Sequence, residues 1–190
     1  MRTVPFTNMA ISLSGGGYRA TAFHLGALSL LDSMELNMDE DPDAGPLTEG
    51  RTLLEHVKVM STISGGTLTG IMYALKLAEG EDFKDCYYTL YDRLETDDLV
   101  PHALDKLNAP NADWKSPWKT RNLINSFSEV YNERFFTTKE GEGATFDTLA
   151  KANPKDSHLT DIIFGTTEFT TGDLFRFQFS EGGKFGGNKL

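Results

Sequence analysis

The residues best suited to covalent chemistry lie in the segment 61–66, whose sequence is STISGG. A serine hydroxyl needs a base to take its proton, donors to hold the oxyanion that forms, and access to the substrate. A sharp turn from strand to helix gives that access, and it requires small neighbours. The segment fits the pattern G-x-S-x-G except at its first position, where Thr62 replaces glycine. Ser64 is therefore the candidate nucleophile, and the alternative is a glycine-rich helix start that Ser64 merely caps.

A second candidate feature is the run Gly15, Gly16 and Gly17, which follows a short apolar stretch and precedes a helical pattern. Successive glycines free backbone N–H groups to point at one spot, and the start of the next helix adds its positive end. The run therefore favours an anion site, for an oxyanion or for a phosphate. Arg19 is the basic residue of the same segment.

The glycine run also has a competing interpretation as a dinucleotide-binding turn. Gly15, Gly17 and Ala20 satisfy G-x-G-x-x-G/A. That interpretation requires an acidic residue about 20 positions later, at the end of a strand. The residue at that distance is Asp39, which lies in an acidic loop with Pro and Gly, so the context argues against it.

Both candidate features are predicted to lie between a strand and a helix. Hydrophobic spacing predicts strands at 9–14 and 56–61, followed by helices at 18–34 and 67–79. The remaining predicted elements are helices at 83–94, 99–107, 118–131 and 146–150, and strands at 160–167 and 174–179 joined by a turn at 171–173. Strands that alternate with helices indicate an α/β fold with a mainly parallel sheet.

The composition narrows the function classes. The chain has 190 residues, enough for one domain, and its 28 acidic and 18 basic side chains give a net charge of −10. This charge argues against nucleic acid as a partner and against electrostatic docking on anionic lipid. The single cysteine, Cys86, cannot form an internal disulfide, and no signal peptide or apolar run of about 18 residues occurs, so we expect a cytoplasmic protein.

Other residues that could do chemistry favour structural roles. The acidic loop 39–46 does not match a calcium-binding loop, and the four histidines stand in no metal-ligand spacing, so neither metal nor cofactor is expected. We expect His24 to pack or hydrogen-bond inside the fold, and His56 and His158 to be structural or solvated. For an apolar group we favour core packing over a lip for acyl chains or a membrane; its members are Val100, Leu104, Leu107, Trp114 and Trp118.

The order and spacing of the two glycine turns resemble the patatin-like phospholipase family. The glycine run precedes Ser64 by about 50 residues. The stretch SGGGYRATAFHLGAL (14–28) is similar to that family's oxyanion segment, and STISGGTLTG (61–70) to its nucleophile turn. IIFGTTEFTTGDLFRF (162–177) is similar to a hairpin further along such domains.

The resemblance implies a three-layer α/β/α fold and a serine lipid acyl hydrolase of phospholipase A or lysophospholipase type. It implies Ser64 as nucleophile of a Ser–Asp dyad, backbone donors from Gly15, Gly16 and Gly17, and Arg19 bracing the loop or the oxyanion. The family's D-G-G/A motif does not occur in residues 1–190. We therefore expect a single domain, cut before the catalytic Asp and inactive alone, with lipid esters as substrate and transient membrane contact. The alternative is a non-catalytic lipid-binding or a nucleotide- or phosphate-binding module.

Overall fold

The computed structural model describes residues 6, 8–35, 52–96, 98–108, 110, 114, 117–150, 157–180 and 184–189. The strands are β1 (Met9–Leu13), β2 (Val57–Ile63), β3 (Asp161–Thr167), β4 (Leu174–Ser180) and β5 (Lys184–Lys189). The helices are α1 (Gly17–Ser33), α2 (Gly65–Ala78), α3 (Phe83–Thr96), α4 (Leu99–Asn108), α5 (Leu123–Val130) and α6 (Phe146–Ala150). A 3₁₀ turn at Leu54–His56 precedes β2, and a π-helical turn at Tyr131–Phe135 follows α5.

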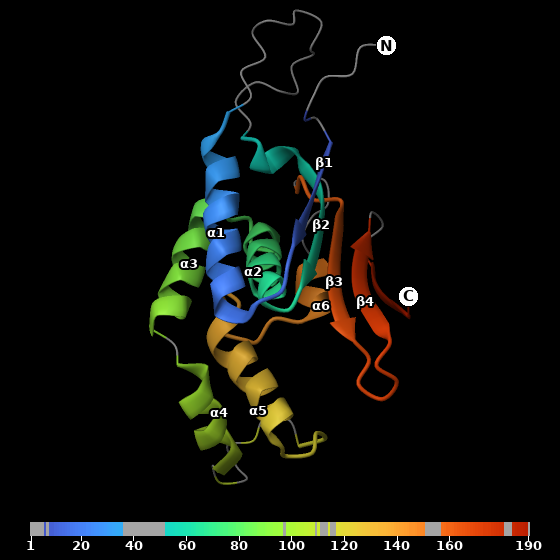
Figure 1. Ribbon diagram of the computed structural model, residues 1–190. Coiled ribbons are helices and arrows are strands. Elements are labelled where there is room, and N and C mark those ends of the chain that lie inside the picture. The colour runs from blue at the N-terminus through green and yellow to red at the C-terminus, as the bar shows by residue number, and fades with distance from the viewer. Residues whose placement is uncertain are drawn as a thin grey trace, which may run out of the picture.

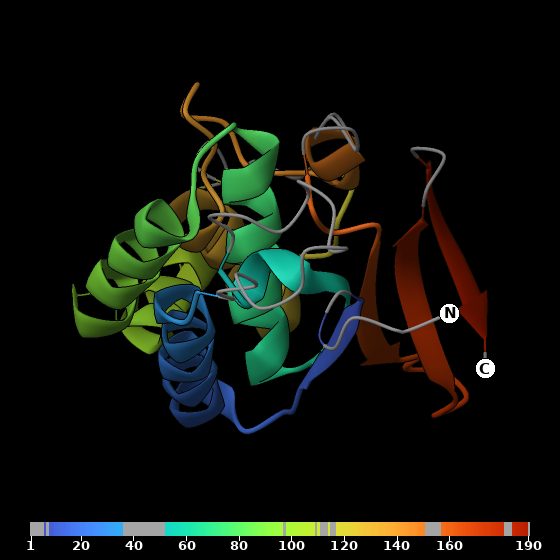
Figure 2. The ribbon, with the colours of Figure 1, turned by 90° about the horizontal axis from the view of Figure 1, so that it is seen from above.

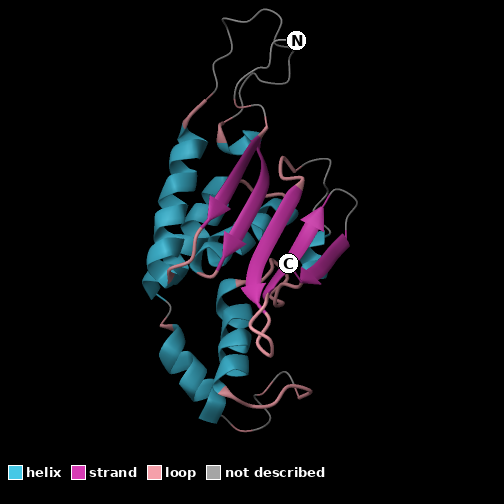
Figure 3. Cartoon of the chain, turned by 45° about the vertical axis from the view of Figure 1, so that its right-hand side comes forward, coloured by secondary structure: helices cyan, strands magenta, loops and turns pink. Residues whose placement is uncertain are grey.

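The strands form one five-stranded sheet in the order β1-β2-β3-β4-β5. The first three are parallel, and β4 and β5 add to them antiparallel. The carboxyl ends of β1, β2 and β3 therefore meet at one edge, where the loops into α1 and α2 also begin. The helices gather on one face of the sheet, as Figures 1 and 2 show, whereas Figure 3 shows the other face without a helix in the described part of the chain.

The core lies between the sheet and α2, which α1 and α3 cover from outside. Met72 and Leu75 of α2 and Met60 of β2 are fully buried there. Next to them α6 closes the face over β3 and β4, where Phe146 stacks on Phe164 with ring centroids 6.2 Å apart. This packing holds α2 against β2, the strand that leads into it through Ser64.

The expected α/β class and the order of strands and helices are confirmed. Of the expected three layers, the described residues form the sheet and one helical layer. The helix expected at 118–131 was placed too early: α5 begins at Leu123, because the side chain of Asn122 caps it by accepting from the N–H of Asn125 at 2.9 Å. Strand β5, in a glycine-rich tail, was not predicted. The acidic loop 39–46, with Asp39, lies outside the described residues.

Several side chains end up where the sequence did not place them. Core packing was wrong for Trp118, Val100 and Leu104, which are 78%, 55% and 45% exposed on and beside the projecting α4 and α5. Cys86, by contrast, is fully buried, and this burial raises the pKa of its thiol. Among the described helices, none is long and apolar enough to cross a membrane.

Candidate active site

Ser64 stands alone between the end of β2 and the start of α2, in a conformation that few residues adopt. Its φ of 52° and ψ of −120° lie outside the common regions, at a cost on the order of 1–3 kcal/mol. Its side chain is exposed and makes no capping hydrogen bond to α2. The alternative of a simple helix cap is therefore wrong, and the backbone strain presents the hydroxyl at the carboxyl edge of the sheet.

Gly65 and Gly66 are required by the closeness of two backbones. A Cβ on Gly65 would lie 2.2 Å from the carbonyl oxygen of Gly17, and one on Gly66 would lie 2.3 Å from that of Leu13. No side chain fits either gap. The first turn of α2 thus rests directly on the loop between β1 and α1, and this contact joins the two glycine-rich segments.

The glycine run reaches Ser64 itself. A Cβ on Gly15 would lie 3.1 Å from the Cβ of Ser64 and 3.7 Å from its Oγ. Gly16 and Gly17 have φ values of 142° and 62°, which side chains rarely tolerate, and Gly17 begins α1. The positive end of a 17-residue helix therefore lies beside the candidate nucleophile.

His24 braces this loop and is not paired with Ser64. The carbonyl oxygen of Ser14 accepts from His24 Nε2 at 2.9 Å and from the N–H of Gly66 at 3.1 Å. Because a carbonyl only accepts, Nε2 carries the proton and cannot take one from a serine. The expected internal role of the buried His24 is confirmed: it fixes Ser14, the residue before Gly15, to α1, while the N–H of Gly66 fixes the same carbonyl to the start of α2.

Thr21 is a brace that the sequence analysis did not identify. Its buried Oγ1 lies 2.9 Å from the carbonyl of Gly65 and 3.1 Å from that of Gly17. Both carbonyls are acceptors and the hydroxyl has a single proton, so the two share it, and Thr21 thereby links the first turns of α1 and α2. The signal was a threonine on the apolar face of α1, four residues after Gly17, but its partner is 44 residues away in the sequence.

Thr62, the departure from G-x-S-x-G, is accommodated by Gly70. A Cβ on Gly70 would lie 2.6 Å from the Thr62 Cγ2, so the glycine leaves room for the threonine methyl. The Thr62 hydroxyl is satisfied too: it donates to the carbonyl of Ile163 at 3.3 Å and lies 3.1 Å from Thr67 Oγ1. The larger residue therefore keeps the turn intact and ties β2 to β3.

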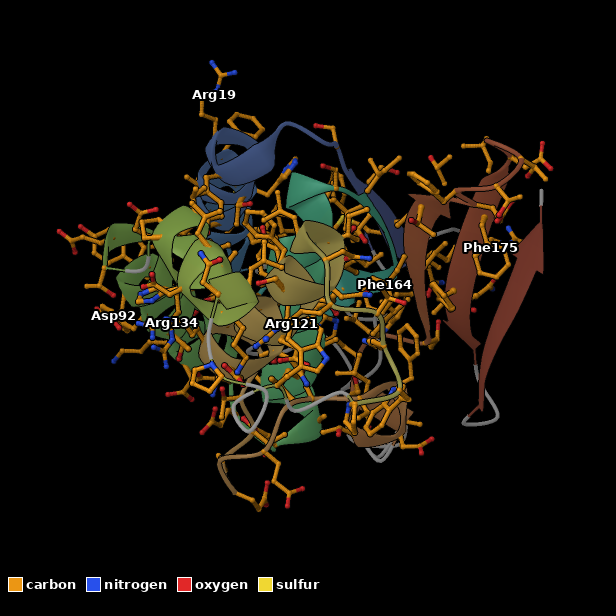
Figure 4. All side chains as sticks on the ribbon, turned by 90° about the horizontal axis from the view of Figure 1, so that it is seen from below. Arg19, Asp92, Arg121, Arg134, Phe164 and Phe175 are labelled. Carbon is orange, nitrogen blue, oxygen red and sulfur yellow. The ribbon has the colours of Figure 1, made fainter. Side chains whose placement is uncertain are left out.

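The side chain of Arg19 does not lie with the other candidate residues, Ser64 and the glycine run. It lies exposed on the first turn of α1, and Figure 4 shows its side chain projecting away from the body of the protein. The described contacts that hold the loop come from His24 and Thr21 instead, so the geometry gives no support to the predicted bracing role of Arg19.

A groove begins beside Ser64 on the open face of the sheet. Its volume is about 380 Å³, and its walls include Ile63, Ile163, Leu174 and Arg176. Ser14 also lines it, so the residues just before Gly15 and Ser64 both border this space. Among the described residues, no Asp or Glu lines the groove and no side chain hydrogen-bonds the Ser64 hydroxyl.

A second, polar cavity of about 430 Å³ lies far from this edge, near the start of β2. There Tyr73 donates to His158 Nε2 at 2.6 Å, and His158 Nδ1 donates to the carbonyl of Val57 at 2.7 Å. Burial raises the pKa of Tyr73. The expected structural role of His158 is confirmed. The described residues contain no group of His, Cys, Asp and Glu side chains that would hold a metal ion.

The fold and the site together define an α/β protein with a strained serine at a strand–turn–helix junction and a glycine-rich turn against it. Comparison with protein families identifies it further. Residues 11–181 match the family described as patatin-like phospholipase. The chain belongs to this family of lipid acyl hydrolases. No curated protein and no solved structure gives a significant match.

Proposed function

We propose that the protein hydrolyses acyl esters of lipids with Ser64 as its nucleophile. The observation that carries this proposal is the contact between Gly15 and Ser64, with the strained backbone of Ser64 beside it. The family supports the lipid ester as substrate class. The strain of Ser64 is accounted for if it serves to expose the hydroxyl, since the side chain makes no capping bond to α2.

In the proposed reaction, Ser64 Oγ attacks the ester carbonyl and loses its proton to a general base. The carbonyl oxygen becomes an oxyanion, held by backbone N–H groups of Gly15, Gly16 and Gly17 and by the positive end of α1. Collapse of the intermediate breaks the bond to the alcohol, which takes the proton and leaves an acyl-serine. Water, activated by the same base, then releases the fatty acid.

The base of this proposed Ser–Asp dyad is not supplied by the described neighbours of Ser64. We therefore expect the catalytic Asp outside these residues, and little activity from residues 1–190 alone. This expectation is separable from the nucleophile assignment, because the 190-residue chain can be assayed beside a polypeptide extended past Leu190, which is what we mean by full-length.

Contact with a lipid surface is part of the proposal. Exposed apolar side chains stand at the edge of the sheet that carries Ser64: Ile63 is 44% exposed, and Phe169, in the loop after β3, is 91% exposed. The projecting α4 and α5 add Val100, Leu104 and Trp118. The net charge of −10 favours apolar contact with a neutral surface over attraction to an anionic one.

Hydrolysis of a p-nitrophenyl acyl ester tests the function. We expect Ser64→Ala to lower the rate of the full-length polypeptide by a factor on the order of a thousand or more. Ser33→Ala is the matched control, because Ser33 is exposed at the far end of α1 and bonds only locally to Leu30. Equal rates for wild type and Ser64→Ala would contradict the proposal.

A further inference from the structure

Three residues form one row across the open face of the sheet, next to Ser64. Ile63 of β2 is paired with Gly165 of β3, and Gly165 is paired with Arg176 of β4. Paired residues on neighbouring strands point to the same face, and strands lie about 4.8 Å apart, so Ile63 and Arg176 stand roughly 10 Å from each other. Gly165 has no side chain, so the row is open in the middle and forms the floor of the groove.

The groove has room for a polar group bonded to Arg176 and for carbon chains beside it. Its walls are mostly apolar, with Ile163 and Leu174 next to the row, and its volume is about 380 Å³. Ser12 and Ser61 line it further along and add hydroxyl groups. This is the usual make-up of a small-molecule site: apolar walls with a few polar groups that fix orientation.

Arg176 is a cation without a counter-ion among the described side chains. It is partly buried, and its Nε is buried without a hydrogen-bond partner. The chain has 28 acidic residues against 18 basic ones, so a carboxylate partner was readily available. An arginine in an apolar groove loses hydration, and this loss is recovered only when an anion binds.

The carboxylate on the same face of β3 is already engaged elsewhere. Asp161 accepts from Gln178 Nε2 at 3.4 Å and from Thr160 Oγ1 at 3.3 Å. It lies four positions from Gly165 along β3, roughly 13 Å away at the usual rise per residue. Asp161 therefore does not neutralise Arg176.

We propose that Arg176 binds the phosphate of a phospholipid or lysophospholipid whose ester bond lies at Ser64. The inference rests on the proposed function and adds to it the residue that recognises the phosphate and so sets how the lipid lies relative to Ser64. The glycerol backbone separates ester and phosphate by only a few bonds, and the row from Ile63 to Arg176 offers that span. A guanidinium can donate two parallel hydrogen bonds to one phosphate, and these bonds are stronger than neutral ones.

Binding to the catalytically silent Ser64→Ala protein tests this without turnover. The ligands are a lysophosphatidylcholine and the monoacylglycerol of the same acyl chain, both below their critical micelle concentrations. We expect Arg176→Gln to weaken lysophosphatidylcholine binding about ten-fold or more, and to change monoacylglycerol binding less than two-fold. Arg176→Lys should fall between, since it keeps the charge but loses the fork. Lys84→Gln, an exposed site on α3, makes the same change in net charge and should have no effect.

The outcomes separate the two proposals. Equal losses for both ligands, or unchanged lysophosphatidylcholine binding in Arg176→Gln, would overturn the phosphate assignment whatever the protein catalyses. A selective loss of lysophosphatidylcholine binding would support it even if Ser64→Ala left esterase activity intact. In that case the assignment of Ser64 as nucleophile would be wrong, and the assignment of Arg176 as the phosphate-binding residue would remain supported. In the active full-length protein, the same selectivity should appear in kcat/KM for the two esters.

Discussion

The backbone of Gly15 lies against the side chain of Ser64, so closely that a Cβ on Gly15 would stand 3.1 Å from the Ser64 Cβ. The two residues come from different strand–turn–helix units, about 50 positions apart in the sequence. Their contact converts two separate glycine-rich turns into one site. A substitution that enlarges residue 15 therefore tests that site directly.

Gly15→Ala is expected to lower esterase activity by at least about ten-fold, because the methyl group displaces either the oxyanion loop or the serine. Thermal unfolding should change little, since the methyl faces the exposed edge of the sheet. Gly26→Ala is the matched control: a Cβ there meets nothing within 4 Å, and alanine favours the helix by about 0.5–1 kcal/mol. The measurements are the rate of ester hydrolysis and the thermal unfolding temperature of both variants. Full activity in Gly15→Ala would contradict the proposed site.

Gly70→Ala is expected to destabilise the protein by about 1–3 kcal/mol, because its Cβ would lie 2.6 Å from the Thr62 Cγ2. Thr62→Ser removes that methyl and keeps the hydroxyl that bonds Ile163. The double variant should therefore recover most of the loss, which urea unfolding of the four proteins measures as a coupling free energy. Additive effects would show that Gly70 is not what accommodates Thr62.

His24→Ala is expected to reduce kcat by about ten-fold, because the Ser14 carbonyl loses one of its two donors and the loop before Gly15 loosens. His24→Gln offers an amide N–H in place of Nε2 and should restore much of the rate. A base could not be replaced in this way, since glutamine takes up no proton at neutral pH. If Gln were as inactive as Ala, with both proteins folded, the bracing role would be wrong.

Glu81 offers a pH test of the fold. Burial raises the pKa of its carboxyl. Ion pairs with Lys76 at 2.8 Å and Lys139 at 2.9 Å lower the pKa by more than burial raises it, so the net shift is downward from 4.5. A lowered pKa in the folded state stabilises the protein above the unfolded value, and this contribution disappears as the pH falls through the folded value.

Glu81→Gln should therefore destabilise the protein at pH 7 by at most about 1 kcal/mol, since water screens these partly exposed pairs. The difference from wild type should shrink when urea unfolding is repeated below pH 4.5. Glu140→Gln, an exposed change in the adjacent turn, serves as the control. A difference that grows in acid would contradict the assigned sign.

The sequence predicted the strand–turn–helix units because their signals are local: apolar runs, helical spacing and glycines at the turns. It singled out Ser64 and the glycine run as candidates for the same reason. It could not show that Gly70 makes room for Thr62, or that Thr21 reaches Gly65, because these contacts depend on how α1 and α2 cross. The start of α5 was misplaced because Asn122 competes as a cap, and β5 was missed because its pairing with β4 outweighs a glycine-rich composition.

The most direct test of Ser64 as nucleophile is covalent labelling of the full-length polypeptide with a fluorophosphonate, which reacts with activated serines, followed by peptide mapping. We predict a single adduct on Ser64, absent in Ser64→Ala and undiminished in Ser33→Ala. No adduct in folded wild-type protein, or an adduct on Ser14 or Ser61 that persists in Ser64→Ala, would contradict the assignment of Ser64 as the nucleophile.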